Sequence, residues 1–246
     1  MSQIVNIVVE GAKDAYFIHE FIKRRFDHVV DQAVPLPGKA LSYNNAEPME
    51  FVHRHKDGSY YRICINNGYG NEGALKKFIE DSDSTRDLVC TAVIFDADTT
   101  GDTVNSGFVN RRKYIEDKTS ELQKQLLSNN LPVAKDIAIY LFPNNSDDGD
   151  LETVMKGMAL PMHRPFFVVC WWVLQCLLSA FSYLRLSNKS MIYDYVEAMY
   201  EKTNKVARVK DKQGYNKNLK AEGLWDWHAQ SLNPLVAFFD SLFDAY

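Results

Sequence analysis

The chain begins with an apolar run that closes on an acid and a glycine, Ile4-Val5-Asn6-Ile7-Val8-Val9-Glu10-Gly11. A continuous apolar run of this length is typical of a strand buried on both faces of a parallel sheet. The residues that follow, 15–26, place apolar side chains at helical spacing, and Asp14 before them is a suitable N-cap. The stretch therefore predicts a strand over residues 3–9, a tight turn and a helix.

Strands and helices continue to alternate downstream. Proline and glycine residues between 34 and 48 predict a loop, and Lys56-Asp57-Gly58 predicts the turn of a hairpin. The alternation favours an α/β fold with a mostly parallel sheet flanked by helices. The expected strands are 49–53, 60–66, 88–95 and 137–142, and the expected helices are 74–80 and 108–127.

Beyond Pro143 the pattern predicts helices only. They cover about 151–158, 166–185, 189–203 and 225–244. We therefore expect an α/β domain over residues 1–158 and a C-terminal helical subdomain over residues 159–246 that packs on it.

The composition, with 46% hydrophobic and 24% charged residues among 246, is that of an ordinary globular protein. A net charge of −4 gives no overall attraction for nucleic acid, so a polyanion must be met by a local basic patch or by bound cations. Four cysteines without CxxC spacing, and no signal peptide before the first strand, predict a cytoplasmic protein. Residues 165–184 carry no charge, but Gln175 and the soluble pattern around them favour a core helix over a membrane span.

Acidic residues follow two of the expected buried strands. Glu10 ends the first, and Asp96 and Asp98 end the strand 88–95. Carboxylates are costly to desolvate unless a proton, a base or a metal meets them, and residues i and i+2 of a strand point to one face. The pattern suits a hard cation such as Mg²⁺. Alternatively, the aspartate pair could cap the next helix or a turn.

A third acidic cluster, Asp147-Asp148-Gly149-Asp150-Leu151-Glu152, follows the strand 137–142. It lies at a strand's carboxyl end, where ligands bind in open α/β sheets. The alternatives are a calcium-like acidic loop and simple N-capping of the helix at 151.

Basic residues gather between Lys202 and Lys220. This segment is the best candidate for contact with a nucleic-acid backbone, although a solvated polar loop is the alternative. Lys13, at the entry of the first helix, could contact phosphate or lie in solvent. The residues of the segment that we expect at phosphate are Lys205, Arg208, Lys210 and Lys212.

The segment from Val8 to Phe17 with Glu10-Gly11, followed some eighty residues later by Ile94-Phe95-Asp96-Ala97-Asp98, resembles the Toprim domain of topoisomerases, DnaG-type primases and OLD-type nucleases. In that family one strand ends in Glu-Gly and a later one in Asp-x-Asp, within a compact parallel sheet between helices. The resemblance covers roughly residues 3–155. Residues 141–152 look like a signature of small bacterial Toprim-like proteins related to the OLD-type nucleases.

The resemblance implies a site that binds Mg²⁺ or Mn²⁺ and processes phosphodiesters. By this likeness Asp96 and Asp98 hold the metal, and Glu10 is a ligand or the catalytic acid/base. Glu152 is the further ligand, with Asp148 and Asp150 behind it. The implied function is a DNA or RNA nuclease, and the alternative is a non-catalytic module that binds nucleic acid or a protein partner.

Two features limit the likeness. No GxxxxGK[ST] motif occurs, so ATP is not an expected ligand, whereas OLD-type proteins usually carry an ATPase domain. The stretch 168–172 is wholly apolar where the small Toprim family usually carries an acid. The oligomeric state stays open, a homodimer included.

Overall fold

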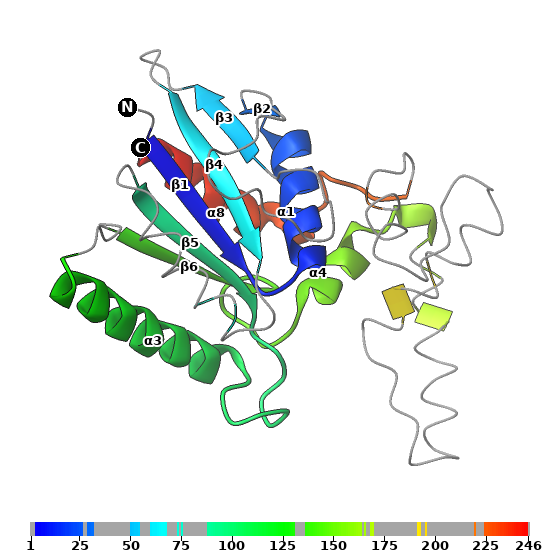
Figure 1. Cartoon of the computed structure of the whole chain (residues 1–246). Coiled ribbons are helices and arrows are strands. Elements are labelled where there is room, and N and C mark those ends of the chain that lie inside the picture. Colours follow the sequence, from blue (N-terminus) through cyan, green and yellow to red (C-terminus); the bar gives the residue numbers. More distant parts are fainter. Residues whose placement is uncertain are drawn as a thin grey trace.

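A computed structural model of the chain describes residues 3–26, 29–31, 50–54, 60–67, 73, 75, 88–130, 136–163, 165, 168–169, 191–192, 195, 219 and 224–245. Figure 1 shows a twisted sheet at the centre with helices on both of its faces. The α/β fold predicted from the sequence is confirmed. The strands are β1 (Gln3–Val9), β2 (Val29–Asp31), β3 (Glu50–Arg54), β4 (Tyr60–Asn67), β5 (Leu88–Asp96) and β6 (Asp136–Phe142).

The sheet has the strand order β2-β3-β4-β1-β5-β6. β1 is parallel to both of its neighbours, β4 and β5, and β5 is parallel to β6, so the apolar runs form the buried centre. β3 pairs antiparallel with β4, as the hairpin prediction required, and the short β2 pairs antiparallel with β3. The pattern had not predicted β2, because three residues are too few to show a period.

Alternate residues of the central strands face two apolar layers. On β5, Ala92 and Ile94 pack on the side of α1 (Ala12–Arg25), α4 (Leu151–Met158) and α8 (Asn233–Asp244). Val93 and Phe95 pack on the other side, under α3 (Phe108–Ser128). Because β4, β1, β5 and β6 run parallel, their carboxyl ends lie at one edge of the sheet, beside the starts of α1 and α4 (Figure 1).

The first helix begins earlier than predicted. α1 starts at Ala12 with Gly11 as its N-cap, and not after an Asp14 cap. Asp14 instead lies in the first turn, where its Oδ2 accepts a hydrogen bond of 2.9 Å from the Gly11 backbone N–H. A carboxylate in this position satisfies a free N–H at the helix start. Asp14 therefore closes the turn that follows Glu10.

The described C-terminal residues complete the core under α1. A short 3-10 helix, η2 (Gln230–Leu232), leads into α8, which begins eight residues later than predicted. The rings of Phe21 and Phe239 lie 5.5 Å apart, and those of Phe26 and Phe243 lie 5.1 Å apart. The residues α8 contributes belong to the same apolar cluster as β1 and α1. Most of the predicted helices 166–185 and 189–203 fall outside the described residues.

The uncharged stretch 165–184 is described only at Pro165, Val168 and Val169, and the last two are exposed. Among the helices that the structure describes, none is both long and apolar enough to cross a bilayer.

Candidate functional site

Glu10 follows β1 at the edge where the parallel strands end. Its Oε1 accepts a hydrogen bond of 3.2 Å from the backbone N–H of Asp96, on the neighbouring strand. Burial is the largest influence on this carboxyl group, followed by the negative charge of Asp14, and together they raise its pKa from 4.5 to about 8. The positive charge of Arg111 acts in the opposite direction. Glu10 can therefore keep a proton near neutral pH.

Asp96 ends β5 and is held by the start of α4. Its Oδ1 accepts a hydrogen bond of 2.9 Å from the Leu151 backbone N–H. Burial raises its pKa well above the usual range, and the charges of Asp14, Glu10 and Glu152 raise it further. Glu152, in the first turn of α4, thus acts on the same carboxylate. Glu10 and Glu152 therefore both lie close enough to Asp96 for their charges to act on it.

Asp98 does not share a strand face with Asp96, which corrects one step of the sequence argument. β5 ends at Asp96, and Asp98 has φ 58°, so the alternation of an extended strand does not reach it. Its backbone N–H donates to the Gly149 carbonyl at 2.7 Å, and its carboxylate forms an ion pair with Arg111 of α3. The Asp96 carboxylate therefore binds a backbone N–H of α4, and the Asp98 carboxylate binds a side chain of α3.

Asp150 caps the helix at 151, as the alternative interpretation expected, whereas Asp148 caps a different helix, α3. Asp150 accepts a hydrogen bond of 2.8 Å from the Thr153 backbone N–H and is the N-cap of α4. Asp148 accepts the Phe108 backbone N–H at 2.7 Å, at the start of α3. It also binds both the backbone N–H and the hydroxyl of Thr100, at 2.9 and 2.6 Å, and these bonds hold its pKa below the usual value. Asp148 thus ties the loop after Asp98 to α3.

Gly107 closes this loop, and we expect its replacement by alanine to destabilise the protein. Its φ of 87° is left-handed, and an added Cβ would collide with the Thr100 hydroxyl. We expect a loss of about 2 kcal/mol or more in the free energy of unfolding, measured by urea titration. Gly101→Ala is the matched control, since Gly101 also has a positive φ, of 97°, with no atom within 4 Å of the added Cβ. Equal losses in both variants would contradict a role for the Thr100 contact.

The residues predicted to contact phosphate fall in two places. Lys13 is partly buried in the first turn of α1, two residues after Gly11. The other predicted phosphate contacts lie outside the described residues, so they stay predictions; they are Lys205, Arg208, Lys210 and Lys212.

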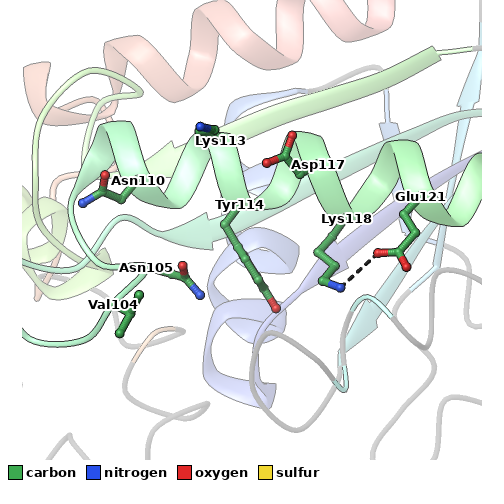
Figure 2. Close-up of a pocket in the computed structure, with 8 residues that line it drawn as sticks. All are labelled: Val104, Asn105, Asn110, Lys113, Tyr114, Asp117, Lys118 and Glu121. Atoms are coloured by element: carbon green, nitrogen blue, oxygen red, sulfur yellow. Dashed lines mark hydrogen bonds and ion pairs between the residues drawn. The ribbon is translucent and has the colours of Figure 1, made fainter.

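A hollow of about 390 Å³ lies along one flank of α3 (Figure 2). Figure 2 shows the Tyr114 ring reaching into it beside Asn105, with the ion pair of Lys118 and Glu121 on its rim. The described residues that line it include none of the predicted metal ligands. It carries acids and bases in equal number, so it shows no preference for an anion.

The donor set at the strand ends fits a hard cation by its chemistry, since all of its members are carboxylates. Within the residues that the structure describes, no three acidic, imidazole or thiol groups already converge on one metal position. Asp98 is engaged by Arg111, and Asp96 by the Leu151 N–H. The acids therefore lie at one edge of the sheet, but the described ones do not form a complete set of metal ligands.

A comparison with protein families shows the family to which the chain belongs. A family model described as a protein of unknown function, DUF3226, matches residues 5–244. The chain belongs to the DUF3226 family. It matches no curated protein and no solved structure. The DUF3226 description states neither fold nor activity, so the Toprim resemblance and its metal stay predictions.

Two features of the site were not predicted from the sequence. One is Arg111, and the other is the charge of Asp14, which acts on Glu10 and Asp96. Asp14 lies four residues after Glu10, in the first turn of α1, and this closeness in sequence could have indicated that it approaches the strand end. Arg111 gave no local signal, because its partner is thirteen residues away across a loop.

Proposed function

We propose that this DUF3226 protein is a Mg²⁺-dependent phosphodiesterase of Toprim type that acts on DNA or RNA. The observation that carries the proposal is the meeting of two half-buried carboxyl groups, Glu10 and Asp96, at neighbouring strand ends, where the Glu10 carboxylate accepts the Asp96 backbone N–H. Loss of contact with water is the largest cause that raises the pKa of each. Ionising such groups is unfavourable for the fold, and pKa values perturbed in this way are typical of functional sites. A bound divalent cation would offset this cost.

An incomplete set of protein ligands is consistent with magnesium binding. Mg²⁺ is usually held by one or two carboxylates, with waters and substrate phosphates completing its shell. Asp96 and Glu152 would hold it here, with Glu10 either as a further ligand or as the acid/base, and Asp98 would join them if it left Arg111. When bound, the ion supplies a Lewis acid for a phosphoryl oxygen.

The chain's own residues supply the remaining chemistry. Glu10, with a pKa of about 8, can give or accept a proton close to neutral pH, which is what a general acid/base requires. Asp96 is oriented by the α4 backbone, so its position does not depend on a mobile side chain. The placement of the Glu10-Gly11 and Asp96-x-Asp98 segments on adjacent parallel strands supports the Toprim resemblance.

The test is cleavage of labelled single-stranded DNA, duplex DNA and RNA by the full chain, with Mg²⁺, Mn²⁺ or EDTA. We expect cleavage only with a divalent cation. Asp96→Asn should lower it about a hundredfold or more, since even outer-shell partners of a metal contribute ten- to hundredfold. Its fold should persist, because asparagine still accepts the Leu151 N–H bond.

Asp102→Asn is the control, since Asp102 is exposed in the loop after β5 and the charge change is the same. It should cleave at the wild-type rate. A wild-type protein that binds the nucleic acids but never cuts them would support the non-catalytic binding module instead. Cleavage that persists in EDTA would contradict the metal requirement.

A further inference from the structure

Arg111 lies where a cation is unfavourable for the helix that carries it. α3 begins at Phe108, so Arg111 is in its first turn, next to the positive end of the helix dipole. The first turn itself contains no acidic side chain, and the Asp148 carboxylate that caps the Phe108 N–H comes from another segment. The Arg111 side chain is also 6% exposed, and a buried guanidinium destabilises a fold unless it is paired. Helix stability therefore does not explain this arginine.

The acids of the candidate site do explain it. The guanidinium of Arg111 forms an ion pair with Asp98, whose side chain is 38% exposed. Its charge also acts on Glu10, where it opposes the effect of the neighbouring carboxylates on the pKa. Arg111 thus brings a positive charge, from α3, to the same edge of the sheet at which Glu10 and Asp96 lie. One of its partners, Asp98, is open to solvent.

The hydrogen bonds around Arg111 fix where its side chain can act. Its backbone N–H donates to the Gly107 carbonyl at 2.8 Å, and the Gly107 N–H donates to the Ala97 carbonyl at 2.8 Å. The start of α3 is therefore joined directly to the residue between Asp96 and Asp98. A guanidinium anchored there can exchange one oxygen partner for another without any change in the fold.

We propose that Arg111 is the phosphate-binding residue of the site, and that it stays paired with Asp98 until a phosphodiester binds. This inference rests on the proposed function. The phosphodiester would replace the Asp98 carboxylate as the oxygen partner of Arg111, and Asp98 would then be available as a ligand for a divalent cation. The planar fork of Arg111 fits two oxygens of a phosphodiester, which a lysine could match only as a point charge.

The decisive experiment needs no metal. Binding of a short fluorescein-labelled single-stranded DNA is measured by anisotropy in EDTA at fixed ionic strength. Asp98→Asn removes the carboxylate that neutralises Arg111, so we expect binding about tenfold tighter than wild type, the equivalent of one charge-assisted hydrogen bond. The double variant D98N/R111M should lose this gain. Asp102→Asn, which removes one exposed acid from the same loop, should not show it.

Two further variants separate this proposal from its rivals. Arg111→Lys in the D98N background keeps the charge but not the fork, so we expect it to retain only part of the gain. Arg111→Met alone should fold, as checked by circular dichroism, and should bind Mn²⁺ at least as tightly as wild type in an EPR titration, because a competing cation is gone. Equal DNA affinity of D98N and D98N/R111M would overturn the proposal.

The two proposals fail in different ways. If wild type binds no Mn²⁺ at the acids, the proposed metal-dependent function fails, while the EDTA measurements still decide the role of Arg111. If Mn²⁺ binds and D98N gives no gain in DNA affinity, the metal site stands and Arg111 is a counter-ion of Asp98 alone.

Discussion

Glu10→Gln is expected to make the metal-free protein more stable at alkaline pH while abolishing divalent-dependent cleavage. The folded-state pKa of Glu10 is about 8, against an ordinary value of 4.5, so the folded protein holds this proton more tightly than the unfolded chain does. Ionising Glu10 therefore lowers stability. The penalty is absent below pH 4.5, grows between pH 4.5 and 8, and is complete above pH 8.

The expected gain in stability follows from the shift in the Glu10 pKa. The displacement of the Glu10 pKa corresponds to at most on the order of 5 kcal/mol, so we expect the Glu10→Gln protein to gain about 2–5 kcal/mol at pH 9. In a chain of this length that is roughly 5–15 °C in Tm. Thermal melts in EDTA between pH 4 and 9 measure it. Glutamine still accepts the Asp96 N–H bond, so the turn after β1 is preserved.

The control replaces an exposed glutamate of α3, Glu116→Gln, and its melts should follow the wild-type pH profile. Mn²⁺ should raise the wild-type Tm most at high pH, where Glu10 is ionised, and should leave the Glu10→Gln protein nearly unchanged. If wild-type and Glu10→Gln proteins lost stability in parallel as pH rose from 4.5 to 8, the raised pKa of Glu10 would be contradicted.

The part of the site that the sequence could predict is the part encoded by local pattern. An apolar run ending in Glu10, and another ending in Asp96, indicate buried parallel strands whose carboxyl ends meet at one edge. The helix over 151–158 was predicted with its full extent, since Asp150 is a strong N-cap signal. These features need no knowledge of distant residues.

The features of the site that could not be predicted from the sequence depend on contacts between distant segments. The left-handed backbone of Asp98 arises from its two hydrogen bonds with Gly149, some fifty residues away. Asp148 caps α3 across forty residues, whereas the local pattern related it to α4. Arg111 is buried on a helix, although arginine is normally exposed, and its partner Asp98 lies before the helix, across a loop. Side chains with remote polar partners leave no period in a sequence.

The C-terminal residues show which contacts a domain prediction leaves out. The change from alternating elements to helices predicted a C-terminal subdomain that packs on the α/β domain, but it did not indicate that Phe239 of α8 is fully buried against Phe21 and Phe26 of α1. Trp225 pairs by a backbone bridge with Ala159, immediately after α4, and the Asp226 N–H donates to the Met158 carbonyl at 2.7 Å. The described C-terminal residues therefore support α4, whose Leu151 N–H holds Asp96.

Phe239→Ala is expected to destabilise the whole protein by about 3–5 kcal/mol, the loss typical of a buried phenylalanine replaced by alanine. The ring fills the space between α8 and α1, and its removal leaves a cavity that aromatic neighbours on both helices cannot close. Urea titrations followed by circular dichroism and by tryptophan fluorescence measure the loss.

Because the described C-terminal residues share one core with β1, both probes should shift together in a single transition. Ser241→Ala, at an exposed position of the same helix, should change stability by less than about 0.5 kcal/mol. Two separate transitions, with only the tryptophan signal displaced by Phe239→Ala, would instead establish an independent helical subdomain. In the single-core case, loss of α8 packing also loosens α4, and divalent-dependent cleavage should fall with the folded fraction and no faster.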